Sequence, residues 1–189
     1  TVTGGRFNWT VKQTSSGTTI QTGSWTDSTP ITGTNLSFAF VAGGQMGQYM
    51  YFDNVSVTQK TNNDTTEPEP EPDTNGTSLY SDNFNSYVAI ENTDKYITTN
   101  NAIVAGQWKT AGNVWGFNAN DLPHVGIKEI SSDNNVLDIE AKAAFEYPRY
   151  FIPVEPASLT IDTSYMHTYK FDIYRSNAQG GGGIRFNKT

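Results

Sequence analysis

The segment from residue 61 to residue 77, TNNDTTEPEPEPDTNGT, constrains the fold of this chain more than any other stretch. It has no aliphatic or aromatic side chain, so it cannot bury enough apolar surface to offset the entropy lost on ordering. Its Glu-Pro pairs alternate a self-repelling charge with a residue that has no backbone N–H to donate to a sheet. The alternative, a surface loop of this length within one domain, is uncommon. We therefore predict an acidic, Pro-rich linker between two modules, residues 1–60 and residues 78–189.

The acidity of the chain is concentrated in this linker. The net charge is −7: residues 1–60 carry three bases and two acids, the linker five acids and no base, and residues 78–189 nine bases and twelve acids. The chain therefore lacks the basic patch that proteins use to bind nucleic acid. It has no cysteine, which excludes disulfides and thiol chemistry. No stretch of the sequence is long and apolar enough to insert into a membrane.

Residues 1–60 have the pattern of β-strands throughout. Apolar and polar residues alternate over residues 7–11 and 36–41, and a further strand over residues 50–57 runs directly into the linker. The turns between these strands are rich in Gly, Ser and Thr. So few strands cannot cover both faces of a two-sheet sandwich. We therefore interpret residues 1–60 as the C-terminal part of a larger β-sandwich module.

Residues 78–189 also have the pattern of strands and turns. The candidate strands cover residues 79–87, 125–130, 135–142, 147–152, 169–174 and, after a glycine run at 180–183, residues 184–186. The pattern predicts the N-terminal part of a second β-sandwich module. Because the chain starts at Thr1 and both ends are abrupt, we interpret it as an excerpt of a longer polypeptide.

Two strands at the edges of these modules resemble strands of known families. YFDNVSV at residues 51–57 is similar to the final strand of bacterial carbohydrate-binding modules. LYSDNFNSY at residues 79–87 resembles the opening strand of concanavalin A-like or jelly-roll sandwiches. The resemblance implies an all-β chain of two incomplete jelly-roll-type modules. It further implies a non-catalytic, polysaccharide-binding segment of a secreted or cell-surface bacterial protein that degrades glycans, with other domains of the same chain as further partners.

A carboxylate pattern leaves an enzymatic alternative open. Jelly-roll glucanases resembling the laminarinases use a strand of the form Glu-x-Asp-x-Glu, whose alternating carboxylates share one face. Here Asp138 and Glu140 match the last two carboxylates, but Val136 stands where the nucleophile belongs. We therefore expect Asp138 and Glu140 on a solvated strand face. The alternatives are the front part of a glycoside hydrolase or polysaccharide lyase domain, and a repeat of a cell-surface adhesin.

Aromatic residues are the best candidates for sugar binding, because sugar rings stack on Trp and Tyr. Trp115 lies among Gly and Asn residues, a context that favours an exposed loop. Tyr147 and Tyr150 flank Arg149, whose guanidinium can donate hydrogen bonds to hydroxyls or to a uronate. We expect these four residues to bind carbohydrate, and the competing interpretation is packing in a core. A core role is expected for Trp9, Trp108, Tyr169 and Phe171.

The resemblance also implies structural calcium. Jelly-roll binding modules hold an ion between their first and last strands with carboxylate and carbonyl oxygens. Asp53 in the closing strand and Asp82 in the opening strand occupy positions where such ligands fall. Because they belong to different modules, we expect two separate ions; otherwise each residue only ends a strand. His124 and His167 are isolated in the sequence and are expected on turns or strand surfaces, and no other cofactor is indicated.

Overall fold

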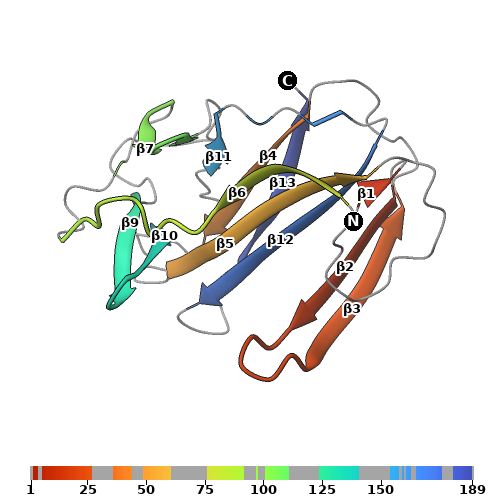
Figure 1. Cartoon of the computed structure of the whole chain (residues 1–189), viewed down its shortest axis with the longest axis horizontal. Coiled ribbons are helices and arrows are strands. Elements are labelled where there is room, and N and C mark those ends of the chain that lie inside the picture. The colour runs from red at the N-terminus through yellow and green to blue at the C-terminus, as the bar shows by residue number, and fades with distance from the viewer. Residues whose placement is uncertain are drawn as a thin grey trace.

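The computed structural model describes residues 2–3, 6–26, 36–43, 49–60, 76–91, 97, 101–110, 124–140, 154–157, 159, 161–162, 165–175 and 181–188. Every regular element in these residues is a β-strand, and the strands form two antiparallel sheets (Figure 1). The prediction of an all-β fold is confirmed, and the arrangement is consistent with a β-sandwich. The described part of the chain contains no helix that could cross a membrane.

The larger sheet has the strand order β3-β2-β1-β12-β5-β10-β9, and β6 pairs with β5 on the edge that β10 also uses. The bounds of its strands are β1 Val2–Thr3, β2 Arg6–Lys12, β3 Thr19–Thr26, β5 Tyr49–Lys60, β6 Thr77–Asp82, β9 His124–Ser131, β10 Asn134–Glu140 and β12 Met166–Arg175. The β2–β3 hairpin joins the rest of the sheet through β1, where Val2 pairs with His167 of β12.

The smaller sheet has the strand order β13-β4-β11-β8-β7. The bounds of its strands are β4 Leu36–Gly43, β7 Ile103–Ala105, β8 Trp108–Thr110, β11 Val154–Pro156 and β13 Gly181–Lys188. β7 approaches β9 of the larger sheet, and β4 approaches β5 and β10, so the two sheets lie over each other. Figure 1 shows β4 and β13 behind β5 and β12.

Strand β5 is central to the larger sheet and pairs with strands from beyond the expected linker. β12 pairs along one edge of β5, and β10 and β6 share the other edge. In the smaller sheet, β4 likewise lies between β13 and β11. Strands from residues 1–60 and from residues 78–189 are thus hydrogen-bonded neighbours in both sheets. The described strands form one two-sheet unit, where two separate modules were expected.

The Glu-Pro repeat lies within residues 61–75, outside the described residues, so its role as a linker stays a prediction. The expected C-terminal boundary of the linker differs from the structure. Gly76 forms a bend, and Thr77 is the first residue of β6, where it pairs with Gln59 near the end of β5. The segment with the repeat therefore connects two antiparallel neighbours of one sheet.

A β-bulge in β5 keeps apolar residues on the core side along the whole strand. Asn54 and Val55 lie opposite Phe171 of β12, where the register shifts. Asn54 has φ 49°, a left-handed conformation that Asn tolerates better than most residues. The extra residue moves the alternation by one position, so Phe52 before the bulge and Val57 after it both reach the core.

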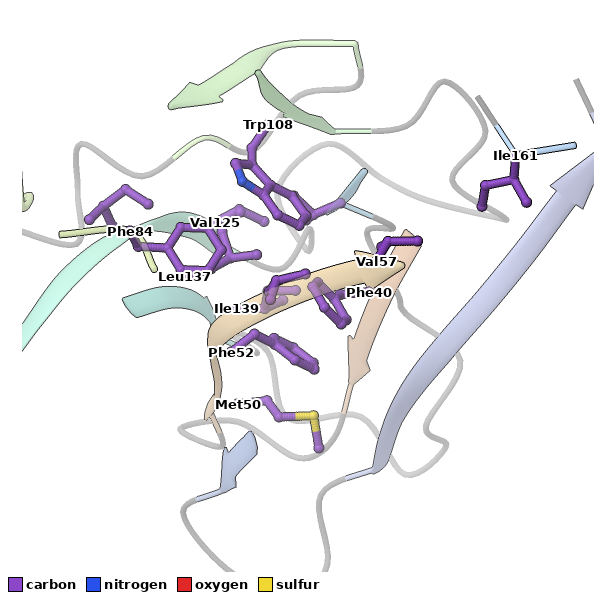
Figure 2. Packing of buried hydrophobic residues seen from close by; sticks show 13 residues of the cluster. Phe40, Met50, Phe52, Val57, Phe84, Trp108, Val125, Leu137, Ile139 and Ile161 are labelled. Carbon is purple, nitrogen blue, oxygen red and sulfur yellow. The ribbon is translucent and has the colours of Figure 1, made fainter. Parts of the chain in front are cut away.

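An aromatic and aliphatic cluster fills the space between the sheets (Figure 2). Phe40 of β4 stacks on Phe52 of β5 with ring centroids 4.2 Å apart, and on Trp108 of β8 at 5.6 Å. Phe84, which follows β6, contacts Trp108 at 5.2 Å. The other members are Met50, Val55, Val57, Val125, Ile127, Leu137, Ile139, Val154 and Ile161. Residues from both sides of the expected linker therefore share one hydrophobic core.

Three of the four residues that were expected in a core lie there. Trp108 is fully buried, and Tyr169 and Phe171 pack against the cluster. The side chain of Trp9, in contrast, is 43% exposed on β2. The prediction is wrong for Trp9, because alternation identifies the two faces of a strand but not whether another layer covers them.

Candidate functional site

The β2–β3 hairpin presents two exposed tryptophans on one face. Trp9 lies opposite Gly23, and Trp25 lies opposite Phe7, so the two tryptophans are diagonal neighbours. Trp9 is 43% exposed and Trp25 is 55% exposed. Val11, two residues after Trp9, is exposed as well. The six positions 7, 9, 11, 21, 23 and 25 are named the hairpin face below.

The hairpin face continues the core side of the larger sheet. Register partners in antiparallel strands share a face, and Val2 of β1 pairs with both Phe7 of β2 and His167 of β12. His167 is buried and precedes by two residues Tyr169, which packs against the core. β7 approaches β9, and β4 approaches β5 and β10, so the order of the strands places β13, the outer neighbour of β4, at the end of the smaller sheet towards β12. The hairpin face therefore lies on the core side of the larger sheet, beyond β13, the last described strand of the smaller sheet on that side.

The indole of Trp9 packs with one ring face against β3 at Gly23. It can do so because Gly23 has no side chain. A Cβ atom at Gly23 would collide with the six-membered ring of that indole. Glycine inside a strand often marks a place where another group approaches the backbone closely. Here the group is the Trp9 ring, so one face of the ring packs on β3 and the exposed part of the side chain faces away from the strand.

The hairpin face carries no charge. Its residues are Phe7, Trp9, Val11, Gln21, Gly23 and Trp25, none of which ionises. The opposite face has small polar pairs, with Asn8 opposite Ser24 and Thr10 opposite Thr22. Uncharged rings held on a strand pair suit the apolar C–H face of a sugar better than they suit a charged ligand.

The outer face of the larger sheet carries a second aromatic group. Tyr49 and Tyr51 alternate with the core residues Met50 and Phe52, so they point away from the core. Their rings stack, with centroids 4.4 Å apart and planes inclined by 13°. Lys128 of β9 donates a hydrogen bond from Nζ to the Tyr51 hydroxyl at 2.9 Å.

Local electrostatics keep Lys128 protonated at neutral pH. Its hydrogen bond to Tyr51 raises the pKa of the Lys128 ammonium, burial opposes the rise, and the Asp138 and Glu140 carboxylates add to it. Burial also raises the pKa of the Tyr51 phenol, against the effect of the hydrogen bond from Lys128. The pair therefore consists of an ammonium donor and a neutral phenol.

The expectation that Asp138 and Glu140 lie on a solvated strand face is wrong for Asp138. Asp138 lies opposite Tyr51 and Gly126 and is fully buried, whereas Glu140, opposite Tyr49, is half-buried. The two carboxylates share the outer face, as their spacing predicts. A fully buried carboxylate is out of reach of a polymeric substrate, so Asp138 has a structural role.

Asp53, expected as a calcium ligand, is buried beside the bulge in β5. Its Oδ1 accepts the N–H of Asn54 at 2.7 Å, and Asn54 Nδ2 donates to Asp172 Oδ2 at 2.8 Å. Burial raises the pKa of Asp53, and the carboxylates of Asp172 and Asp82 raise it further. The Asp53 and Asp82 carboxylates are therefore close enough to interact, whereas the sequence predicted that they bind two separate ions in different modules. Within the described residues, no three His, Cys, Asp or Glu side chains form a group that could hold a metal ion.

Asp82, the other expected calcium ligand, accepts a network of hydrogen bonds. Its Oδ2 accepts from the Tyr80 hydroxyl at 3.2 Å, the Tyr87 hydroxyl at 2.7 Å and Trp108 Nε1 at 2.9 Å. Its Oδ1 accepts the N–H of Phe84 at 2.8 Å. Burial, together with the hydrogen bond to Asp82, raises the pKa of Tyr87 to about 12. These four donors give Asp82 a structural role that connects the end of β6 to the core.

His167 is buried, contrary to the expectation of a surface residue. In the described structure, its Nε2 has no hydrogen-bond partner. Burial lowers the pKa of His167, against the effects of the Asp162 carboxylate and of a hydrogen bond with the Tyr165 backbone. His167 is therefore a neutral residue of the interior. The other histidine, His124, is the first residue of β9.

The four residues that were expected to bind carbohydrate, Trp115, Tyr147, Arg149 and Tyr150, lie outside the described residues. Their roles stay predictions. The sequence alone did not identify Trp9 and Trp25 as candidates. A signal was present, since Gly23 interrupts an otherwise regular strand two residues before Trp25. Its meaning depends on the pairing of Gly23 with Trp9, which the sequence does not give.

No family model, curated protein or solved structure matches this chain. The class that the fold and surface define is an all-β protein, consistent with a β-sandwich, that exposes aromatic side chains on a strand pair. The function must therefore be inferred from the chemistry of those side chains.

Proposed function

We propose that this chain is a non-catalytic, polysaccharide-binding segment of a secreted or cell-surface protein. The observation that carries the proposal is the Trp9 indole, which lies on Gly23 with Trp25 nearby on an uncharged face. Exposed rings on a strand pair suit the apolar faces of successive sugar units. The resemblance of residues 51–57 and 79–87 to edge strands of carbohydrate-binding and jelly-roll modules supports the same class of ligand. Any catalysis then belongs to other domains of the same polypeptide.

The affinity of two rings for one polymer chain is modest. Aromatic stacking contributes about 0.5–1.5 kcal/mol per contact. Retention on a polysaccharide therefore depends on repeated contacts along the polymer or on several linked modules, which raise the effective concentration. The predicted contacts from Trp115, Tyr147, Arg149 and Tyr150 remain part of this proposal as additional subsites.

The double variant Trp9→Ala, Trp25→Ala should bind the preferred polysaccharide about tenfold or more weakly than the wild type. Two stacking contacts of about 1 kcal/mol each account for a change of this size. Affinity electrophoresis in gels that contain β-glucan, xylan, agar or alginate measures the effect as lost retardation. The control is Ile20→Ala, which should migrate like the wild type. Ile20 is an exposed apolar residue of β3, the strand that also contains Trp25. Equal retardation of the wild type and the double variant in every gel contradicts the proposal.

A structural calcium ion at Asp53 is proposed from the same resemblance. A cation there would relieve the repulsion that Asp172 and Asp82 exert on the buried Asp53 carboxylate. EDTA should then lower the melting temperature and excess calcium should restore it, because a ligand of the native state alone stabilises that state. Asp53→Asn should remove the response to calcium. Identical melting curves of the wild type in EDTA and in calcium would leave Asp53 with a purely structural role.

A further inference from the structure

The β2–β3 hairpin, which carries the hairpin face, joins the larger sheet through a short contact. Within the described residues, β2 and β3 pair only with each other and with the two-residue strand β1, which lies at one end of the hairpin (Figure 1). Strand β1 in turn pairs with β12 through one register pair, Val2 with His167. In contrast, β5 and β12 pair along most of their length. Because elements with few partners open at the lowest cost in free energy, we expect this sheet to open first at β1.

His167 lies at this contact and is buried with one ring nitrogen unpaired. Its side chain is 2% exposed, and its Nε2 atom has no hydrogen-bond partner among the described residues. A hydrogen bond with the Tyr165 backbone occupies the other ring nitrogen, so Nε2 is the atom that a further proton must occupy. That proton would place a charged donor in the interior without an acceptor, which costs far more than burying the neutral ring.

Few charged groups face His167 to offset this cost. Among the described residues, the carboxylate that acts on its ring is that of Asp162, in the segment before β12. Tyr169, on the same face of β12, has its ring centroid 6.5 Å away, and burial raises the pKa of its phenol, so it is neutral. The neighbouring strands add no ionisable group, since β1 has none and the register partner on β5 is Gln59. Burial outweighs Asp162, and the pKa of His167 lies below its ordinary value.

We propose that protonation of His167 opens the contact between β1 and β12 and releases the hairpin, so that the chain holds its polysaccharide at neutral pH and releases it in acid. Opening at β1 removes a strand neighbour of His167 and lets water reach the charged ring. A two-stranded hairpin without the rest of its sheet is at best marginally stable in water, so the packing of Trp9 on Gly23 near Trp25 is lost. The inference rests on the proposed function for the ligand, whereas the opening itself requires no ligand.

The direction of the pH dependence follows from the two protonation equilibria of His167. In the open form the ring is in water and has its ordinary pKa, whereas in the closed form burial lowers the pKa. Protons therefore bind more tightly to the open form, and the closed form loses stability as the pH falls below the ordinary value. If the closed form stays neutral, the equilibrium constant for opening increases up to about 25-fold between pH 7 and pH 5, for an ordinary pKa of about 6.5.

Two spectroscopic measurements test the opening without any sugar. The chain has two histidines, so an NMR titration of the wild type and of His124→Gln assigns the His167 signal, which should titrate below its ordinary pKa. Hydrogen exchange then gives protection factors, which correct for the intrinsic effect of pH on the exchange rate. The amides of β2 and β3 should be less protected than those of β5, and their protection should fall about tenfold or more from pH 7 to pH 5.

Non-titrating variants show whether His167 causes this fall. His167→Leu and His167→Gln should each remove it, and His124→Gln should keep it. Circular dichroism at pH 7 identifies the variants that fold. In affinity electrophoresis, referred to polymer-free gels at each pH, the wild type should be retarded less at pH 5 than at pH 7. A folded His167 variant should be retarded equally at both.

Four outcomes overturn the inference. They are a His167 pKa at or above the ordinary value, hairpin amides as protected as those of β5, an equal fall of protection in the folded His167 variants, and equal retardation of the wild type at both pH values. Failure of the proposed function gives a different result: the hairpin opens in acid as expected, but no polysaccharide retards the wild type at pH 7. That result would remove the sugar ligand and leave the opening at His167 supported.

Discussion

Replacing Trp108 by Ala lowers the free energy of unfolding by about 3–5 kcal/mol. The side chain is fully buried, contacts Phe40 and Phe84, and donates a hydrogen bond to Asp82. Truncation therefore leaves a cavity and removes one donor from the half-buried Asp82 carboxylate. Urea denaturation followed by circular dichroism measures the change. The control is Ile103→Ala in the neighbouring strand β7, where Ile103 is exposed; its free energy of unfolding should stay within about 0.5 kcal/mol of the wild type. A decrease of less than about 1 kcal/mol in Trp108→Ala would contradict the core position of Trp108.

The same substitution combined with Phe40→Ala tests whether the chain has one shared core. The two rings stack at 5.6 Å, and Phe40 precedes the Glu-Pro repeat whereas Trp108 follows it. Residues in contact couple by about 0.5–3 kcal/mol, and residues in independent units have additive effects. A coupling in that range supports a single unit, and strictly additive losses would support two separate modules.

Replacing Asp82 by Ala lowers the free energy of unfolding by about 3 kcal/mol or more. The substitution leaves Tyr80, Tyr87 and Trp108 without the acceptor that they share, and a buried group without its partner costs about 1–3 kcal/mol. Asp82→Asn keeps one carbonyl oxygen and should lose less. The control is Ser81→Ala, an exposed neighbour, which should unfold like the wild type.

A second readout separates the loss of this network from general destabilisation. The Asp82 carboxylate contributes to the pKa of about 12 at Tyr87, so the pKa of Tyr87 should fall towards its ordinary value in Asp82→Ala. Ultraviolet absorbance of the phenolate in an alkaline titration measures it. An unchanged stability and an unchanged phenol titration would show that Asp82 does not act as the shared acceptor.

Local sequence patterns determined where the chain forms strands. The strands expected at residues 7–11, 36–41, 50–57 and 169–174 lie within β2, β4, β5 and β12. Alternation of apolar and polar residues specifies an extended strand with two different faces, and this requires no knowledge of the partner strand. The strand expected over residues 79–87 ends earlier, at Asp82, because its Oδ1 accepts the N–H of Phe84 and Phe84 takes φ 58°.

The pairing of the strands could not be read from the sequence in the same way. Backbone N–H and C=O groups are the same in every strand, so the alternation in β5 does not reveal that β6, β10 and β12 are its neighbours. The composition of residues 61–77 predicts a segment outside any buried core, and for residues 61–75, which lie outside the described residues, this stays a prediction. It does not decide whether the strands on its two sides belong to separate sheets.

The candidate site depends on the same missing information. Trp9 and Trp108 both occupy apolar positions of strands, and the sequence assigned both to a core. Trp108 is fully buried between the sheets. The side chain of Trp9, near the end of the larger sheet, packs against Gly23 and remains 43% exposed. The sequence by itself determined the faces of the strands, because side-chain direction is a local property of the backbone. Only the tertiary structure decided which face a second sheet covers, because that depends on contacts between residues far apart in the chain.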